Sequence, residues 1–544
     1  MFLYLRDEDD GALWSVFLAP VAGAPERYEA SAEPGRVRCL RIERGIEAEC
    51  EVFVAPDAHV ELRRVRLRNL GPRARRLSVT SCIGVVLHHA GAHAGHPAFS
   101  KLFVQTQVDA AAELLLARRR PRGPEPPPPV LAHALFGPGS TQFETDRARY
   151  LGRGRSPARP AALDPGVALG GGVGNVLDPI FAWRRDIALA PGASAELVCV
   201  LALAPSEAEA SALAQRVRIA VALRDARDGA EQRARAELAR CGLSPGQGAY
   251  LQGLLAALLG GEPGLRAPAD VLRRARGTPD DLWSFGLPPD EPLAVVESDA
   301  LARELATAIA YWGALGLGVK GLALGAAPAP DGLSRPKPDT DSRLIDSARA
   351  LARLHLRDTW PPPAAAPSSP RRVHRASVAR APAPSRSPGS LLFANGFGGF
   401  DPAGREYVID VACDPGAEHL PPMPWCNVIA NEGFGTLVSE RGAATTWSRN
   451  SREHRLTPWS NDPIADRHSE ALWLRDDEAR VFWSPQPGPT PAGGGYEVRH
   501  GFGHSSWRHR SRDLLQEVTV LVAPDAPLKL TRVRITNLGE TSRA

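Results

Sequence analysis

Residues 52–71 read VFVAPDAHVELRRVRLRNLG, and residues 520–539 read VLVAPDAPLKLTRVRITNLG. In both, apolar and charged residues alternate with period two, as in Leu62–Arg68, which is the pattern of a β-strand with one buried face. The Ala-Pro-Asp and Asn-Leu-Gly steps place turn residues between the strands. Because such half-buried strands form antiparallel sheets that pack face to face, the repeat predicts two related β-sandwiches.

The two copies align over different parts of their length. Residues 3–7 match residues 472–476, so about eighty residues of the second copy precede this match, whereas the first copy has only two. After Gly71 the first copy continues for more than a hundred strand-rich residues, whereas the second ends soon after its matching turn. We therefore expect a first sandwich at residues 1–205 that lacks its beginning, and a second at residues 391–544 that lacks its end.

The sequence between the two copies consists of two segments that differ in composition and in predicted structure. In residues 206–325, helix-forming stretches precede an apolar strand, an amphipathic helix and a second apolar strand, expected at 293–296, 300–315 and 319–324. This order predicts one βαβ unit. Residues 326–390 are rich in Pro, Ala, Ser and Arg, which predicts a disordered linker. The expected fold class is mainly β, with two incomplete sandwiches joined by a helical and βαβ segment and a linker.

Composition argues against several classes of function. The formal net charge of +4 over 544 residues is too small to indicate a nucleic-acid partner. The seven cysteines include no Cys-x-x-Cys pair, so neither a metal site nor a disulfide framework is expected. No window holds the ~18 uninterrupted apolar residues of a membrane helix, and the acidic N-terminal segment is unlike a signal peptide. We expect a soluble, cytoplasmic chain without cofactors.

Three motifs in the second copy are specific enough to suggest a family. They are NGFGGF at residues 395–400, WCNVIAN at 425–431 and TWSRNSREHRLTPWSND at 446–462. Together they resemble the galactose-mutarotase-like supersandwich domain of glycoside hydrolase family 94, formerly glycosyltransferase family 36, which includes inverting disaccharide phosphorylases. The tandem arrangement is similar to that of cyclic β-1,2-glucan synthases, and residues 96–104 and 144–155 resemble their upstream supersandwich.

The resemblance implies a carbohydrate-active protein but no catalytic residue in this chain. In that family an (α/α)6 barrel after the supersandwich carries the general acid, and inorganic phosphate attacks the anomeric carbon. No residue here matches the barrel. We therefore expect the carbohydrate-binding portion of a glucan synthase or β-glycoside phosphorylase-like enzyme, inactive alone, with a glucan oligosaccharide or polysaccharide as partner.

In that interpretation inorganic phosphate is a partner only of the complete enzyme, and any membrane anchor of a parent synthase would lie in regions outside this sequence. Two alternatives stay open. The chain could be a stand-alone glucan-binding scaffold without catalysis, or the non-functional product of a split gene.

The best candidate for sugar contact is the stretch of the second copy that is rich in Trp, Arg and Asn. Sugar rings have apolar C–H faces and hydroxyl edges, so their sites combine flat aromatic rings with planar hydrogen-bonding groups. The candidate residues are Trp447, Arg452, Arg455, Trp459, Asn461 and Asp462. The competing interpretation places the tryptophans in the core and the charges in salt bridges. Because the first copy lacks the equivalent stretch, we expect the second copy alone to carry this surface.

Two further patterns resemble sites but favour structural roles. Gly and Ala separate His88, His89, His93 and His96, which indicates a flexible loop rather than a tetrahedral metal site. Asn395–Phe400 has the glycines of part of a phosphate-binding loop but not its third spaced glycine, so we expect a tight turn there.

Overall fold

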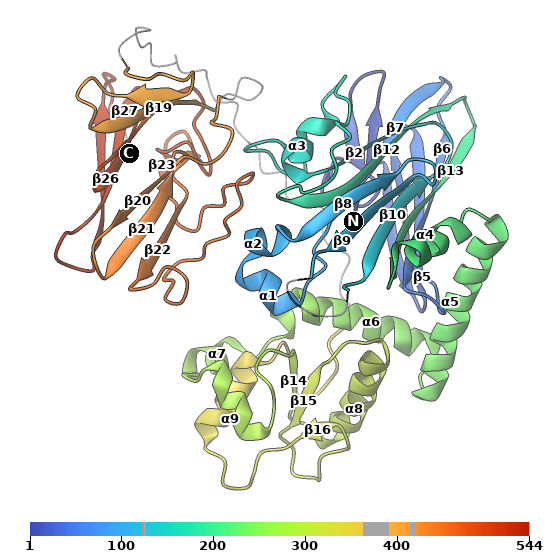
Figure 1. Cartoon of the computed structure of the whole chain (residues 1–544). Coiled ribbons are helices and arrows are strands. Elements are labelled where there is room, and N and C mark those ends of the chain that lie inside the picture. Colours follow the sequence, from blue (N-terminus) through green and yellow to red (C-terminus); the bar gives the residue numbers. More distant parts are fainter. Residues whose placement is uncertain (122, 124–126, 363–390, 414–418, 543–544) are drawn as a thin grey trace.

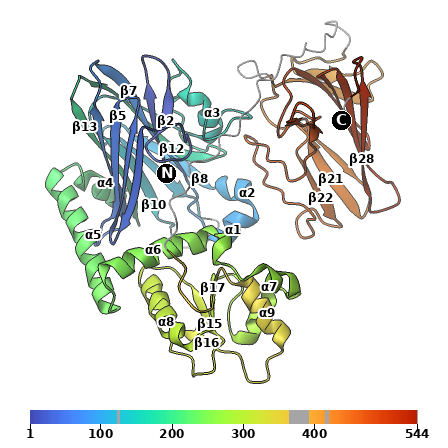
Figure 2. The ribbon, with the colours of Figure 1, turned by 180° about the vertical axis from the view of Figure 1, so that it is seen from behind.

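The computed structural model describes residues 1–121, 123, 127–362, 391–413 and 419–542. The chain forms three bodies, which Figure 1 shows as a first β-sandwich, an α/β unit below it and a second β-sandwich beside the first. Seen from behind, two helices lead from the first sandwich to the α/β unit (Figure 2). They are α5 (Ala220–Arg240) and α6 (Pro245–Gly260). The mainly β fold predicted from the repeat is confirmed.

The first sandwich consists of a five-stranded and an eight-stranded antiparallel sheet. The strands of the smaller sheet are β1 (Phe2–Asp7), β2 (Leu13–Ser15), β7 (Arg75–Gly84), β11 (Ser140–Asp146) and β12 (Pro179–Leu189), in the order β11-β12-β7-β1-β2. The strands of the larger sheet are β3 (Arg27–Glu33), β4 (Arg36–Glu43), β5 (Ile46–Val54), β6 (Val60–Asn69), β8 (Val104–Asp109), β9 (Leu114–Arg119), β10 (Val130–Phe136) and β13 (Ser194–Ala204), in the order β3-β4-β5-β6-β13-β10-β9-β8.

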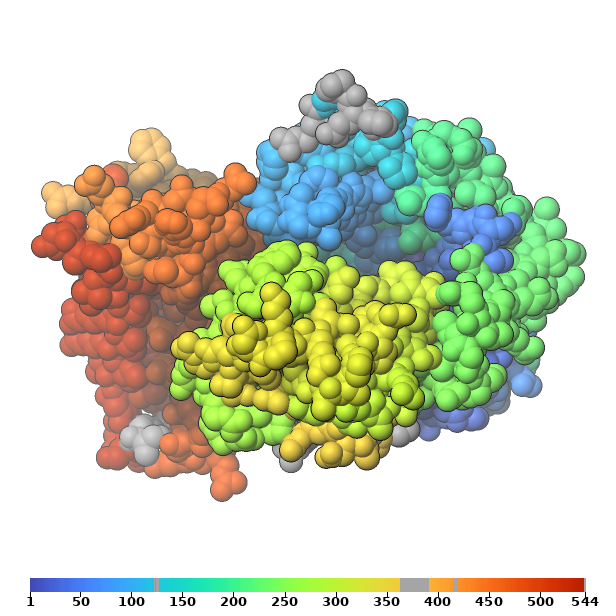
Figure 3. Space-filling view, turned by 90° about the horizontal axis from the view of Figure 1, so that it is seen from below, coloured from blue at the N-terminus to red at the C-terminus, as the bar shows by residue number. Residues whose placement is uncertain are grey.

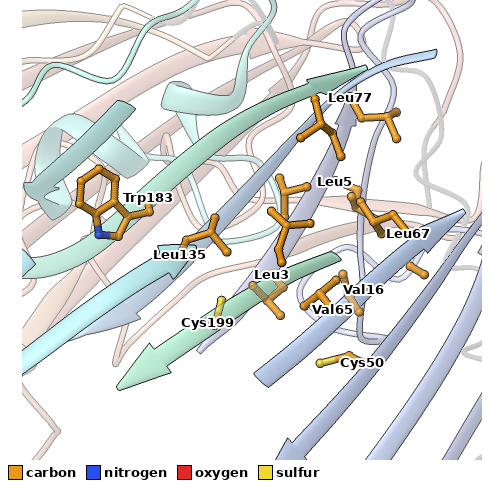
Figure 4. Packing of buried hydrophobic residues seen from close by; sticks show 14 of the residues in the cluster. Leu3, Leu5, Val16, Cys50, Val65, Leu67, Leu77, Leu135, Trp183 and Cys199 are labelled. Carbon is orange, nitrogen blue, oxygen red and sulfur yellow. The ribbon is translucent and has the colours of Figure 1, made fainter. Parts of the chain in front are cut away.

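The core of the first sandwich lies between these sheets because alternate residues of each strand point inward. Figure 4 shows Leu3 and Leu5 of β1 close to Val65 and Leu67 of β6. Trp183 of β12 belongs to the same buried cluster. The outer face of the larger sheet carries a second apolar cluster, which α4 (Glu207–Arg216) and α5 cover.

Short helices connect the strands of the first sandwich. They are α1 (Ala90–Gly95), α2 (Pro97–Lys101), α3 (Arg147–Leu151) and the 3-10 turn η1 (Ala161–Leu163). The histidine-rich segment expected as a loop thus forms α1 and α2. The His89 carbonyl accepts a hydrogen bond from the His93 N–H at 3.0 Å, and the His96 side chain caps α2 by accepting from the Phe99 N–H at 3.1 Å. The segment is therefore helical over residues 90–95 and 97–101.

The α/β unit has a four-stranded parallel sheet in the order β16-β15-β14-β17. Its strands and helices are β14 (Leu293–Val296), α8 (Asp299–Ala314), β15 (Lys320–Ala323), β16 (Leu333–Ser334), α9 (Ser342–Leu351) and β17 (Leu354–Leu356), and η2 (Pro263–Leu265), α7 (Ala269–Arg274) and η3 (Pro279–Phe285) precede them. The predicted βαβ unit is present as β14, α8 and β15, with β14 parallel to β15.

The linker prediction was wrong for residues 326–362. Asp341 caps α9 by accepting from the Arg343 N–H at 2.8 Å, and Ala348 of α9 is fully buried. β17 then adds to the sheet beside β14. Because the apolar residues of α9 recur at helical spacing, they bury a face that the average composition of the segment conceals. The remainder of the predicted linker, residues 363–390, lies outside the described residues.

The second sandwich packs a six-stranded sheet against a three-stranded one. The larger sheet has the order β18-β19-β25-β26-β27-β28, the smaller β20-β21-β22, and β23 and β24 pair separately. The strands are β18 (Gly398–Phe400), β19 (Glu406–Ala412), β20 (Cys426–Ala430), β21 (Phe434–Ser439), β22 (Ala444–Ser448), β23 (Leu474–Asp476), β24 (Val481–Trp483), β25 (Gly495–Gly501), β26 (His504–Ser511), β27 (Leu514–Val522) and β28 (Lys529–Asn537).

The internal repeat is visible as matched strands. β5 and β6 form a hairpin in the first sandwich, and β27 and β28 form the corresponding hairpin in the second. The surroundings differ, because β6 also pairs with β13, whereas β28 pairs only with β27 among the described strands. The expected turn opens the second sandwich, where Asn395 Oδ1 accepts from the N–H groups of Phe397 and Gly398, both at 3.1 Å. No helix in the described part of the chain is long and apolar enough to span a membrane.

Candidate functional site

The candidate stretch lies where the second sandwich faces the first. Figure 3 shows, from below, the orange and red second sandwich beside the blue segment of the first. After β22 the chain turns toward α1 and α2, and Trp459 meets the His96 ring edge to face, with ring centroids 5.9 Å apart. A residue of the predicted site thus contacts the other sandwich.

Trp459 and Arg455 form an aromatic and cationic pair. The guanidinium carbon of Arg455 lies 5.9 Å from the centroid of the Trp459 ring. Arg455 Nε also donates to the carbonyl of Ser451 at 3.3 Å. Because a guanidinium is attracted to an indole face, the two half-buried side chains hold each other at the boundary between the sandwiches.

Asp462 links the two sandwiches through Arg147 at the start of α3. Both guanidinium Nη atoms of Arg147 donate to the carboxylate of Asp462 at 3.1 Å. Arg147 Nη1 also donates to Asp178 at 2.8 Å, and Lys101 Nζ donates to the same Asp178 at 2.6 Å. Burial alone would raise the pKa of Asp462, but the hydrogen bonds and charge of Arg147 outweigh it and lower that pKa.

Two clefts lie between the sandwiches, and His96 and Phe99 line both. The Asn461 cleft has a volume of about 620 Å³, and its polar lining includes Lys101, Arg147, Asp178, Asn461 and Asp462. The Arg455 cleft has a volume of about 770 Å³, and its polar lining includes His88, Ser100, Arg119, Arg452, Glu453 and Arg455. Both volumes are in the range of small-molecule sites.

The structure brings five of the six predicted residues to this boundary. Trp447 is the exception. It is half-buried in β22, and its ring lies so close to Gly435 that a Cβ added there would stand 2.5 Å away. Residues of α1 and α2 and Arg147, all of the first sandwich, line the opposite walls of these clefts. The expectation that the second copy alone carries the sugar-facing surface stays a prediction.

A second charged contact joins the sandwiches and was not predicted from the sequence. Arg153 Nη2 donates to Glu440 Oε1 at 2.6 Å and lies 3.4 Å from Asp466 Oδ2. The Glu440 side chain is fully buried and also accepts from the Trp425 N–H at 2.8 Å. Burial is the main cause that raises the pKa of Glu440 to about 7, with Arg153 acting in the opposite direction and Asp466 in the same one.

The clefts offer no evident place for a metal ion. In the part of the chain that the structure describes, no three His, Cys, Asp or Glu side chains are grouped to hold one. The ring nitrogens of two of the histidines have protein partners, since His88 Nδ1 lies 2.8 Å from Ser100 Oγ and His96 Nδ1 accepts from the Phe99 N–H. What the arrangement offers is a polar and aromatic surface shared by two sandwiches.

Comparison with known proteins agrees with this architecture. Residues 1–220 and 405–544 match the glycosyl hydrolase 94 supersandwich domain. The chain is 30% identical to the cyclic β-(1,2)-glucan synthase NdvB of Rhizobium meliloti (strain 1021), over 100% of this chain and 21% of that protein. It is 29% and 26% identical to the N,N'-diacetylchitobiose phosphorylases of Vibrio furnissii and Vibrio proteolyticus, over 27% of this chain and 18% of each enzyme. The chain thus spans about a fifth of the length of these relatives. Since the domain match covers more than half of the chain, the protein belongs to the glycosyl hydrolase 94 family through its supersandwich domain.

Proposed function

We propose that this chain is the carbohydrate-binding part of a glucan synthase or phosphorylase-like enzyme and that the sugar binds in the Asn461 and Arg455 clefts. Membership of a carbohydrate-active family supports the general role, and the printed name of the relative matched along the whole chain, a cyclic β-(1,2)-glucan synthase, supports a glucan as ligand. In this proposal catalysis belongs to other parts of such an enzyme.

The observation that carries the proposal is the contact of Trp459 with His96 and Arg455, two residues that line the adjoining clefts. The half-buried indole offers an apolar face for sugar C–H groups. The exposed Asn461 and the guanidinium of Arg455 offer hydrogen bonds to hydroxyl edges. Aromatic face and planar polar groups within one site are what a neutral sugar ring requires.

The charges in the Asn461 cleft favour binding over catalysis. Its carboxylates, Asp178 and Asp462, are both held in ion pairs with Arg147. A general acid for glycosidic bond cleavage needs a raised pKa, whereas the pKa of Asp462 is lowered. Neither carboxylate is arranged to protonate a leaving oxygen.

Replacing Trp459 with alanine should weaken glucan binding. Loss of one stacked aromatic contact typically costs about 1–3 kcal/mol, which is about 5- to 150-fold in affinity. Isothermal titration of the full chain with β-1,2-linked glucan oligosaccharides measures this. Trp473→Ala is the matched control, because Trp473 is 54% exposed on the same sandwich and its indole N–H donates to Thr490, which lines neither cleft, whereas Trp459 contacts His96 and Arg455, which do.

Because Trp459 also contacts His96, the melting temperature of each variant must be compared with that of the parent. Arg455→Ala supplies a second test at the same site. If Trp459→Ala and Arg455→Ala bind oligosaccharide as tightly as Trp473→Ala does, these side chains hold the two sandwiches together and the proposal fails.

A further inference from the structure

The loop that carries Asn461 also enters the first sandwich. Five residues of this loop (residues 460–467) line the Asn461 cleft, namely Ser460, Asn461, Asp462, Pro463 and Arg467. Ile464 lies between them in the sequence, but the residues that line the two clefts do not include it. Because Ile464 is only 3% exposed, its side chain is buried elsewhere.

Ile464 of the second sandwich is buried among residues of the first. It belongs to a hydrophobic cluster whose nine other buried members all come from the first sandwich, namely Tyr4, Cys82, Tyr150, Leu151, Ala162, Leu163, Leu169, Ile180 and Ala182. Burial of an apolar side chain is favourable in proportion to the area removed from water. The Ile464 side chain therefore anchors the loop in the first sandwich by an uncharged contact.

Polar contacts hold the loop on both sides of this anchor. The Gly154 N–H of the first sandwich donates to the Ile464 carbonyl at 2.9 Å. Asp462 Oδ1 accepts from the N–H groups of Ile464 and Ala465, both at 3.1 Å, and Asp462 is also paired with Arg147. Figures 1 and 2 show α3, which begins at Arg147, on the side of the first sandwich that faces the second. Both sandwiches thus determine where the loop lies.

We propose that Ile464 is a positioning residue of the sugar site and that its anchorage in the first sandwich holds Asn461 and Asp462 at their places in the Asn461 cleft. This inference rests on the proposed function and names a residue on which the geometry of that site depends. The cleft is lined from both sandwiches, so its width depends on how they are held together. Ile464 is three residues from Asn461 and does not itself line the cleft, so it acts on the sugar only through the loop.

The test compares Ile464→Ala with a matched isoleucine variant in the full chain. Ile429 of β20 is 1% exposed and lies in a cluster formed by the second sandwich alone. Ile429→Ala therefore removes the same atoms from an equally buried position without changing the contact between the sandwiches.

Isothermal titration with β-1,2-linked glucan oligosaccharides, at a temperature where every variant is folded, measures the effect on the site. Ile464→Ala should weaken binding about tenfold or more, because the arrangement that binds sugar becomes a minor population, whereas Ile429→Ala should weaken it less than about twofold. Ile464→Val loses one methyl group and keeps the branched shape, so it should retain most of the affinity.

Hydrogen exchange read peptide by peptide gives a second measurement that needs no sugar. Ile464→Ala should speed exchange in peptides of the first sandwich that contain Tyr150 and Ile180, whereas Ile429→Ala should affect only peptides of the second sandwich. With a parent that binds, equal affinities of Ile464→Ala and Ile429→Ala would overturn this inference and leave the proposed function intact. Weaker binding by Ile464→Ala without faster exchange in the first sandwich would also overturn it, because the anchorage would then not be the cause. Absence of glucan binding by the parent would overturn both proposals.

Discussion

Replacing Leu62 with alanine lowers the free energy of unfolding of the first sandwich by about 2–5 kcal/mol, whereas Leu530→Ala lowers that of the second by less than about 1 kcal/mol. The two leucines occupy the same position of the internal repeat, 468 residues apart. The same substitution in the same local sequence is thus expected to have very different effects.

The reason is the surroundings of the two strands. Leu62 of β6 is 0% exposed and belongs to the cluster beneath α4 and α5. Leu530 of β28 is 45% exposed. Deleting buried methyl groups loses their transfer free energy and leaves a cavity. Truncating a half-exposed side chain loses much less transfer free energy and leaves a much smaller cavity.

Hydrogen exchange read peptide by peptide measures the two effects separately, since a chain with several bodies need not unfold in one step. Peptides from β5 and β6 report on Leu62→Ala, and peptides from β27 and β28 report on Leu530→Ala. Similar losses of protection in the two hairpins would contradict the prediction, because they would mean that Leu530 is as well packed as Leu62.

Strands and turns of the repeat could be predicted because their signals are local. The alternation in Leu62–Arg68 places each side chain on one face of a strand without reference to any distant residue. The Asn395 turn is likewise set by one side chain and the N–H groups that follow it. Such elements need only short-range sequence information.

The boundary between the sandwiches could not be predicted in that way. Arg147 and Asp462 are 315 residues apart, and Arg153 and Glu440 are 287 apart. Each partner lies in a recognisable stretch, but neither stretch contains a signal that indicates which distant residue it contacts. The candidate site was therefore assigned to one sandwich, although the geometry divides it between two. The α9 helix was missed for a different reason, because composition was averaged over a segment that contains a short periodic stretch.

The stability of the second sandwich should fall as pH rises through the window set by Glu440. The pKa of this carboxyl is raised from 4.5 to about 7 in the folded chain. Between these values the folded state binds one proton more than the unfolded state, so the Glu440 contribution is fully present below about 4.5 and is lost as pH rises to about 7. From about pH 4.5 to about pH 7, this contribution to the free energy of unfolding decreases by about 1.4 kcal/mol per pH unit, and above about pH 7 it no longer changes.

Several charged groups surround Glu440 and share in this balance. Arg153 holds its carboxylate, and Asp466 lies beside the same guanidinium while accepting from Ser439 Oγ at 2.7 Å. Two carboxylates thus compete for one arginine at a buried boundary, which favours keeping one of them protonated. The pH profile of the parent chain alone cannot isolate Glu440, because the whole chain contributes to it.

The difference between the parent and Glu440→Gln isolates it, because glutamine keeps the shape and cannot ionise. Urea unfolding at several pH values should show the parent losing stability relative to this variant between about pH 4.5 and 7. Glu470→Gln is the matched control, because the contribution of Glu470 to stability should depend on pH in the opposite direction. Burial would raise the pKa of Glu470, but Lys529 and two threonine hydroxyls lower it, so its stabilisation is present above about pH 4.5 and is lost as pH falls. A parent profile parallel to that of Glu440→Gln across the window would show that Glu440 is ionised in the folded chain and that Arg153 outweighs its burial.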